Sequence, residues 1–103
     1  MFRRCDKRWK PRGKIFGEIP GSCDWPWMKS QVEQLVGVSD VRLNADPCIE
    51  FRFRDLDFAV FDSTGWEPDN EPRYWFYVYQ AKPDERALAE IENHFNERQP
   101  ATA

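Results

Sequence analysis

The chain has 103 residues, a formal net charge of −3, and hydrophobic and aromatic fractions of 41% and 16%, which is enough for one domain with one modest core. No apolar run approaches the roughly 20 residues of a membrane-spanning helix, and the charged N-terminus lacks the apolar core of a signal peptide. We therefore expect a cytoplasmic protein that does not bind membranes.

Charge is distributed unevenly along the chain. Residues 1–14 contain seven basic residues and one acid, a net charge of +6, whereas residues 15–103 carry −9. We interpret residues 1–14 as a basic N-terminal arm, residues 15–98 as a single domain and residues 99–103 as a short tail. Such an arm either attracts phosphates electrostatically or folds back onto the acidic body. Its candidate polyanion-binding residues are Arg3, Arg4, Lys7, Arg8, Lys10, Arg12 and Lys14.

A short strand over 14–19 and a turn at Pro20-Gly21 lead into the first predicted helix. Asp24 suits the N-cap position, and Gly37 suits the position just beyond the C-terminus. Between them, apolar residues recur at helical spacing and form one stripe. The stripe consists of Met28, Val32, Leu35 and Val36.

Alternation of apolar and polar residues predicts three or four antiparallel strands in the middle of the chain. Residues 41–45 alternate until Pro47, which cannot donate to a ladder, interrupts the pattern. Residues 48–54 and 57–62 alternate on both sides of the tight turn "RDLD", which indicates a hairpin. After a long acidic connection, residues 73–80 form the last strand.

The chain ends with a predicted helix. Pro83 suits its first position, and Asp84 and Glu85 complement the helix dipole. Its apolar stripe is formed by Leu88, Ile91 and Phe95. The expected fold is α+β, in α-β-β-β-α order, with an N-terminal and a C-terminal helix packed on one face of the meander.

The last strand, "RYWFYVYQ", is aromatic on both faces, so its register decides which side chains are available to a partner. We favour Tyr74, Phe76 and Val78 in the core, because phenylalanine and valine have no polar group, whereas tyrosine and tryptophan tolerate a partly solvent-exposed position. Trp75 and Tyr77 would then lie outside. The reverse register stays open.

The outer sheet face is the candidate binding site. Its residues would be Arg52, Arg54, Trp75, Tyr77 and Tyr79, together with Trp66 of the acidic connection. Tryptophan, tyrosine and arginine are enriched at the energetic centres of protein interfaces. The leading hypothesis is a non-catalytic interaction domain that binds another protein, a second copy of itself included.

Two other interpretations of these residues stay open. The first is a nucleic-acid-associated protein that uses the basic arm with Arg52 and Arg54. The second is purely structural, because cross-strand aromatic and arginine pairs stabilise many sheets without any ligand.

A zinc site is not expected. Cys5, Cys23 and Cys48 are widely spaced, and with His94 they would form a Cys3His set without the close pairing typical of zinc sites. We expect all three thiols to be free of metal.

Catalysis is not indicated either. Cys48 and His94, with Asp46, have no spacing that demands a nucleophile and base. The acidic loop residues Glu67, Asp69 and Glu71 lack the glycine and spacing of an EF-hand. We expect no enzymatic activity and no cofactor.

Overall fold

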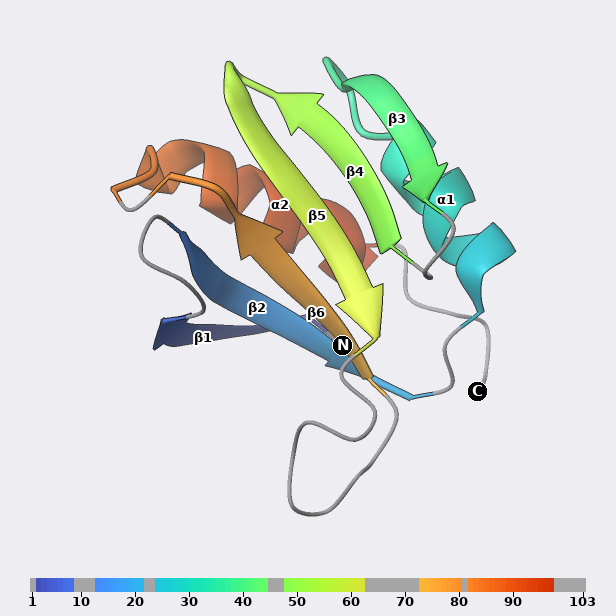
Figure 1. Ribbon diagram of the computed structural model, residues 1–103, viewed down its shortest axis with the longest axis horizontal. Helices are drawn as coiled ribbons and strands as arrows, with labels where there is room; N and C mark the ends of the chain where they lie inside the picture. The colour runs from blue at the N-terminus through green and yellow to red at the C-terminus, as the bar shows by residue number, and fades with distance from the viewer. Residues whose placement is uncertain are drawn as a thin grey trace.

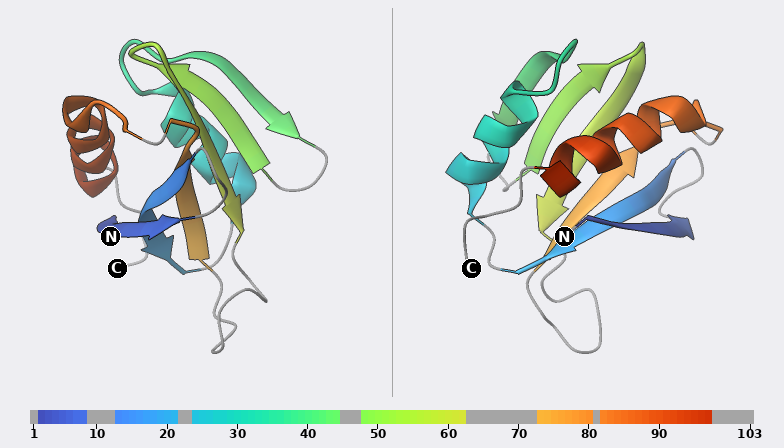
Figure 2. Two further views of the ribbon diagram at one scale, coloured as in Figure 1. Left: turned by 60° about the vertical axis from the view of Figure 1, so that its left-hand side comes forward. Right: turned by 180° about the vertical axis from the view of Figure 1, so that it is seen from behind.

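The computed structural model describes residues 2–8, 13–21, 24–44, 48–62, 73–80 and 82–97. These residues form one six-stranded antiparallel sheet in the order β1-β2-β6-β5-β4-β3, with two helices. Both helices lie on the same face of the sheet (Figures 1 and 2). The elements are β1 Arg3–Arg8, β2 Lys14–Pro20, α1 Trp25–Glu33, β3 Ser39–Asn44, β4 Cys48–Phe53, β5 Leu56–Asp62, β6 Arg73–Val78 and α2 Glu85–Glu97.

The α+β class is confirmed, whereas the predicted number and order of strands are wrong. Strands β3 to β6 form a four-stranded meander, and the β1–β2 hairpin adds two further strands beside β6. The order along the chain is therefore β-β-α-β-β-β-β-α. The connection through α1 carries the chain from β2, near one edge of the sheet, to β3 at the other edge.

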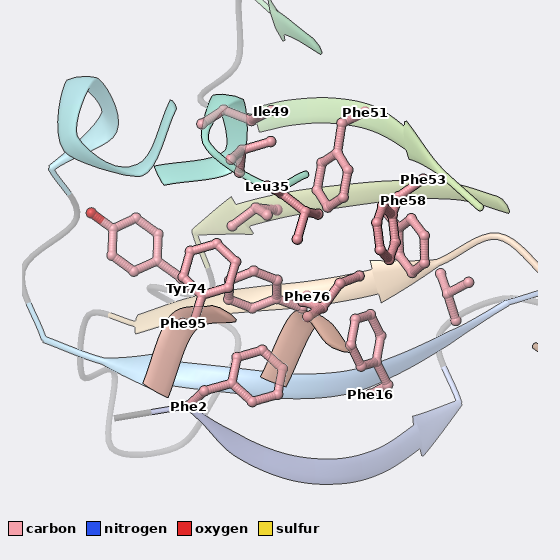
Figure 3. Packing of buried hydrophobic residues seen from close by; sticks show 14 of the residues in the cluster. Phe2, Phe16, Leu35, Ile49, Phe51, Phe53, Phe58, Tyr74, Phe76 and Phe95 are labelled. Atoms are coloured by element: carbon pink, nitrogen blue, oxygen red, sulfur yellow. The ribbon is translucent and has the colours of Figure 1, made fainter. Parts of the chain in front are cut away.

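The main core lies between the sheet and the two helices (Figure 3). The favoured register of the last strand is confirmed, because Tyr74, Phe76 and Val78 are buried in this core. Complete burial of one such side chain contributes about 1.5–3 kcal/mol. The neighbouring strands contribute Ile49, Phe51, Phe53, Phe58 and Val60 to the same core.

Helix α1 begins as predicted but ends earlier. Asp24 is its N-cap, and its carboxylate accepts a hydrogen bond of 3.1 Å from the Trp27 N–H. The helix ends at Glu33 with Gln34 as its C-cap, so Val36 lies beyond the helix and is 89% exposed. The predicted stripe is correct for Met28 and Val32, whereas Leu35 is buried in the main core but lies beyond the helix, as Val36 does. The chain turns towards β3 at Gly37, whose φ of +94° favours glycine.

Helix α2 begins two residues later than predicted, at Glu85 and not at Pro83. The Asp84 carboxylate accepts a hydrogen bond of 3.0 Å from the Arg86 N–H, which is typical of an N-cap. Pro83 therefore precedes the helix and does not occupy its first position. Near the other end, His94 is buried and its Nε2 donates to the Gln31 carbonyl oxygen at 2.7 Å, which ties α2 to α1.

The N-terminal segment is not a separate arm over the part that the structure describes. Arg3 to Arg8 form an edge strand paired with β2, so the predicted domain boundary at residue 14 divides a hairpin. Phe2 is 2% exposed, and its ring centroid lies 4.9 Å from that of Phe76. Gly17 makes room for it, because a Cβ there would lie 2.1 Å from Phe2 Cζ. An edge strand can be this rich in charge because much of its surface faces solvent.

Candidate functional site on the open face of the sheet

The sheet face that points away from the helices is called the open face here. Strand alternation places on it Ile15, Cys48, Glu50, Arg52, Asp57, Ala59, Phe61, Trp75 and Tyr77. It has two regions of different character: an aromatic cluster over β2, β6 and β5, and a charged hollow over β3, β4 and β5.

The aromatic cluster consists of Ile15, Ala59, Trp75 and Tyr77, which pack together and apart from the main core. Trp75 and Tyr77 lie on the face that the sequence predicted, but they are only 4% and 6% exposed. The expectation that these two rings form an accessible contact surface is therefore wrong. Burial raises the pKa of the Tyr77 phenol.

Two neighbours that the sequence did not predict help to enclose these rings. The Lys7 ammonium of β1 lies 4.7 Å from the centroid of the Trp75 ring, a distance typical of a cation–π contact. The backbone at Gly13 approaches the Tyr77 hydroxyl so closely that a Cβ there would lie 2.1 Å from it. The aromatic cluster thus acts as a second, smaller core.

Arg54 does not lie on the open face, contrary to the prediction. It and Asp55 form the two-residue turn between β4 and β5, with φ of 51° and 63°, as a type I′ turn requires. The turn ends the strand alternation and directs Arg54 towards α2, where its Nε and Nη2 each donate to Glu90 at 2.6 Å. This hydrogen bonding with Glu90 raises the pKa of Arg54.

The charged hollow has a volume of about 400 Å³. Arg52 donates to Asp57 at 2.9 Å, and Arg42 pairs with Glu50 at 3.4 Å. Its lining consists of Asp40, Arg42, Glu50, Phe51, Arg52, Asp57, Phe58 and Tyr79. Volumes of roughly 300–1,000 Å³ are typical of sites that accept small ligands.

Tyr79 follows β6 directly and forms the aromatic wall of the charged hollow. Its backbone N–H donates to the Asp57 carbonyl at 3.0 Å, and its hydroxyl donates to Glu50 Oε2 at 3.1 Å. The side chain is 41% exposed, so it is the predicted aromatic site residue that a partner can reach. Burial of the phenol and the adjacent Glu50 carboxylate raise its pKa to about 12.

Asp40 reaches the charged hollow through an irregularity in β3. The pairing of β3 with β4 shifts between Ser39 and Arg42, and Asp40 has a φ of 55°. A bulge of this kind turns a side chain out of the regular alternation. Sequence periodicity did not identify Asp40, Arg42, Glu50 and Asp57 as site residues. Strand alternation did place Glu50 on the same face as Arg52, two residues along the same strand, and Asp57 lies opposite Arg52 on the neighbouring strand.

Several cations of the predicted arm form ion pairs. Arg3 pairs with Glu18 of the domain at 2.8 Å, and Lys14 pairs with Asp6 of the arm itself at 3.8 Å. Arg4 pairs with two carboxylates of α2, Glu85 at 2.6 Å and Glu92 at 3.7 Å. The hydrogen bond from Arg4 lowers the pKa of Glu85. Arg8 belongs to β1, whereas Lys10 and Arg12 lie outside the described residues, as does the predicted site residue Trp66.

Of the candidate metal ligands that the structure describes, Cys5 and Cys48 lie apart from His94. Cys5 and Cys48 pack against the aromatic cluster from β1 and β4, whereas His94 lies between the helices on the other side of the sheet. Burial raises the pKa of the Cys5 thiol, which makes it a poor nucleophile at neutral pH. Within the described ranges, no three metal-ligating side chains gather into a site. The other predicted candidates lie outside these ranges: Cys23, Asp46, Glu67, Asp69 and Glu71.

Comparison with known proteins gives no match to a family model, to a curated protein or to a solved structure. None of the described helices has the length and apolar character needed to cross a lipid bilayer. The functional argument therefore rests on the chemistry of the open face. Of that face, the charged hollow is the part that combines accessibility with arginine and tyrosine side chains.

Proposed function

We propose that this protein is a small non-catalytic domain that binds another protein through the charged hollow. The observation that carries the proposal is the hollow of about 400 Å³ with the 41% exposed Tyr79 on its wall and two arginines in its lining. Tyrosine and arginine dominate the energetic centres of protein interfaces, because they offer large contact areas and several hydrogen bonds. A homodimer formed through the same surface is one form of this proposal.

Because Trp75 and Tyr77 are buried, the proposed binding surface excludes them and consists of the β3–β5 side of the open face. A partner that engages this side would replace the water around Tyr79 and retain the ion pairs of Arg42 and Arg52 at its rim. Such rim pairs favour specificity and association rate more than affinity. We place the interaction in the cytoplasm, because three widely spaced cysteines do not resemble a disulfide framework.

The nucleic-acid alternative has weaker support. Arg52 and Arg54, its two predicted phosphate ligands outside the arm, point to different sides of the sheet and each pair with a carboxylate. Arg3, Arg4 and Lys14 of the arm are paired in the same way. A polyanion could bind these basic side chains only by displacing the carboxylates that already pair with them.

The test is affinity capture from a lysate of the source organism, with and without nuclease, using wild-type protein and two variants. Tyr79→Ala removes the aromatic wall, and Arg86→Ala is the control because Arg86 lies exposed on α2. The proposal expects a protein that is captured by wild type and by Arg86→Ala, is lost with Tyr79→Ala, and is unaffected by nuclease. Analytical ultracentrifugation of the same variants tests the homodimer. Capture that Tyr79→Ala does not change, or that nuclease abolishes, would contradict the proposal.

A further inference from the structure

We propose that the charged hollow receives a basic side chain of the partner, an arginine in the first instance. This inference rests on the proposed function and specifies the chemistry of its ligand. The occupant follows from the balance of charge in the lining, from the position of the Tyr79 ring and from the charge of the whole domain.

The balance of charge in the hollow is negative. The lining contains three carboxylates, on Asp40, Glu50 and Asp57, and two guanidinium groups, on Arg42 and Arg52. Each guanidinium already has a carboxylate partner within the lining. The Asp40 carboxylate forms no ion pair with any residue that the structure describes. An incoming cation therefore finds an uncompensated carboxylate, whereas an incoming anion finds arginines that are already neutralised.

Tyr79 adds a surface that suits a guanidinium in particular. Its hydroxyl is held by Glu50 at 3.1 Å, and its ring remains 41% exposed. A planar guanidinium stacks on an aromatic ring through cation–π attraction and still directs N–H groups towards carboxylates at its edge. An ammonium makes the same charge contact but has no plane to stack, so arginine is favoured over lysine.

The field of the whole domain points the same way. Residues 15–103 carry a net charge of −9, and strand β1, which has four basic residues and one acid, lies at the opposite edge of the sheet from β3. Complementary charge on a partner raises the rate of encounter and excludes acidic competitors. The β3 side of the open face is thus the side that a basic partner approaches without meeting the basic strand β1.

The probes are four capped amino acids, each with an N-acetyl group and a C-terminal amide: arginine, citrulline, lysine and glutamate. Citrulline has nearly the shape of arginine but no charge. Binding is followed by amide chemical shifts of the labelled protein. We expect capped arginine to shift amides around residues 40, 50, 57 and 79 with a dissociation constant on the order of 1 mM. Lysine should bind more weakly, and citrulline and glutamate should not bind.

Asp40 and Asp55 provide a matched pair of variants. Both are exposed aspartates with positive φ, 55° and 63°, and asparagine tolerates that conformation equally well. Asp55 is not part of the lining of the charged hollow. Asp40→Asn should weaken capped arginine about two- to fivefold, as loss of an exposed ion pair does, whereas Asp55→Asn should leave its affinity unchanged.

The results separate this inference from the proposed function. Binding of citrulline as tight as that of arginine, binding of glutamate in place of arginine, or equal losses in the two variants would overturn the inference. Tyr79-dependent capture of a protein without any response to capped arginine also overturns it, while the proposed function stands. A response to arginine that Asp40→Asn weakens, without Tyr79-dependent capture, supports the cation site and contradicts the proposed function.

Discussion

At the scale of single residues, Tyr79 reports directly on the environment of the charged hollow. Its pKa is raised from 10.0 to about 12 by burial and by the Glu50 carboxylate. Because the folded pKa lies above the unfolded one, this phenol stabilises the fold fully below pH 10 and ceases to do so as the pH rises through 12. Replacement of Glu50 by glutamine removes the neighbouring charge and should lower the pKa of Tyr79, while burial keeps it above its ordinary value.

The measurement is an ultraviolet titration of phenolate formation in wild type, Glu50→Gln and Tyr79→Phe. Subtraction of the Tyr79→Phe curve isolates the transition of Tyr79 from those of the other tyrosines. An unchanged Tyr79 transition in Glu50→Gln would show that the hydroxyl does not donate to Glu50 in solution.

Gly17 and Phe2 are in contact, so the effects of substitutions at the two positions on stability should depend on each other. A Cβ at Gly17 would lie 2.1 Å from Phe2 Cζ, so Gly17→Ala must displace the buried ring. We expect this variant to lose about 1–3 kcal/mol of unfolding free energy, as overpacked sites do. In a Phe2→Ala background the clash is absent, and the same change should cost much less. Chemical denaturation of the four proteins of this cycle measures the coupling, and additive losses would contradict the placement of Phe2 over Gly17.

At the scale of elements, strands in which apolar and polar residues alternate regularly were predictable, and strands with irregular pairing were not. β4 and β5 alternate without interruption, and the register of β6 followed from the polar groups of its side chains. The charges of β1 predict a solvated arm, whereas burial of Phe2 and the pairing with β2 hold this segment in the sheet. The position of such a strand depends on a partner strand that local sequence does not reveal.

The same limit explains what was missed in the candidate site. The shift in pairing beside Asp40 and the positive φ at Arg54 each turn a side chain away from the alternating pattern. Alternation predicted that Trp75 and Tyr77 face away from the helices. It did not predict their burial, because the contact of Lys7 with Trp75 depends on the position of β1 in the sheet. The sequence thus predicted towards which face of the sheet a side chain points, whereas the solvent exposure of that side chain depended on tertiary contacts.

Strand β6 allows its two faces to be compared by adjacent substitutions. Phe76 lies in the main core, where Phe→Ala changes cost about 3–5 kcal/mol of unfolding free energy. Tyr77 lies in the smaller aromatic cluster, and we expect Tyr77→Ala to cost about 1–3 kcal/mol. Tyr79→Ala should cost the least, about 1 kcal/mol, because the residue is 41% exposed and loses one hydrogen bond to Glu50 and one ring contact with Tyr77. Denaturant midpoints measure the three losses, and a neutral Tyr77→Ala would mean that the ring is accessible in solution after all.

At the scale of the whole molecule, part of the separation of charge along the sequence is balanced in three dimensions. Among the described residues, Arg3 of β1 pairs with Glu18 and Arg4 with Glu85. These ion pairs neutralise part of the positive charge of β1, so the two ends of the folded sheet differ less in charge than the two parts of the sequence do. They also determine how the whole protein should behave towards a polyanion.

We expect the full-length protein not to be retained on heparin at an ionic strength of about 0.15 M, where screening limits exposed charges to a range of roughly 8 Å. A phosphate or sulfate would need to replace carboxylates that already lie 2.8 Å and 2.6 Å from Arg3 and Arg4. The informative variant is Glu18→Gln, which keeps the backbone pairing of β1 with β2 and releases both Arg3 and Arg73 from the carboxylate that they share. Deletion of residues 1–14 would be uninformative, because it also removes Phe2 from the core.

Elution positions of wild type and Glu18→Gln on a salt gradient decide the matter. Weak retention that appears only at low salt, and that increases in Glu18→Gln, is the result expected when ion pairs within the domain compete with the polyanion. Strong retention of wild type, with an affinity that falls steeply with salt, would mean instead that the basic residues release their carboxylates readily. The nucleic-acid alternative would then have the better support, since the cost of displacing those carboxylates is the argument against it.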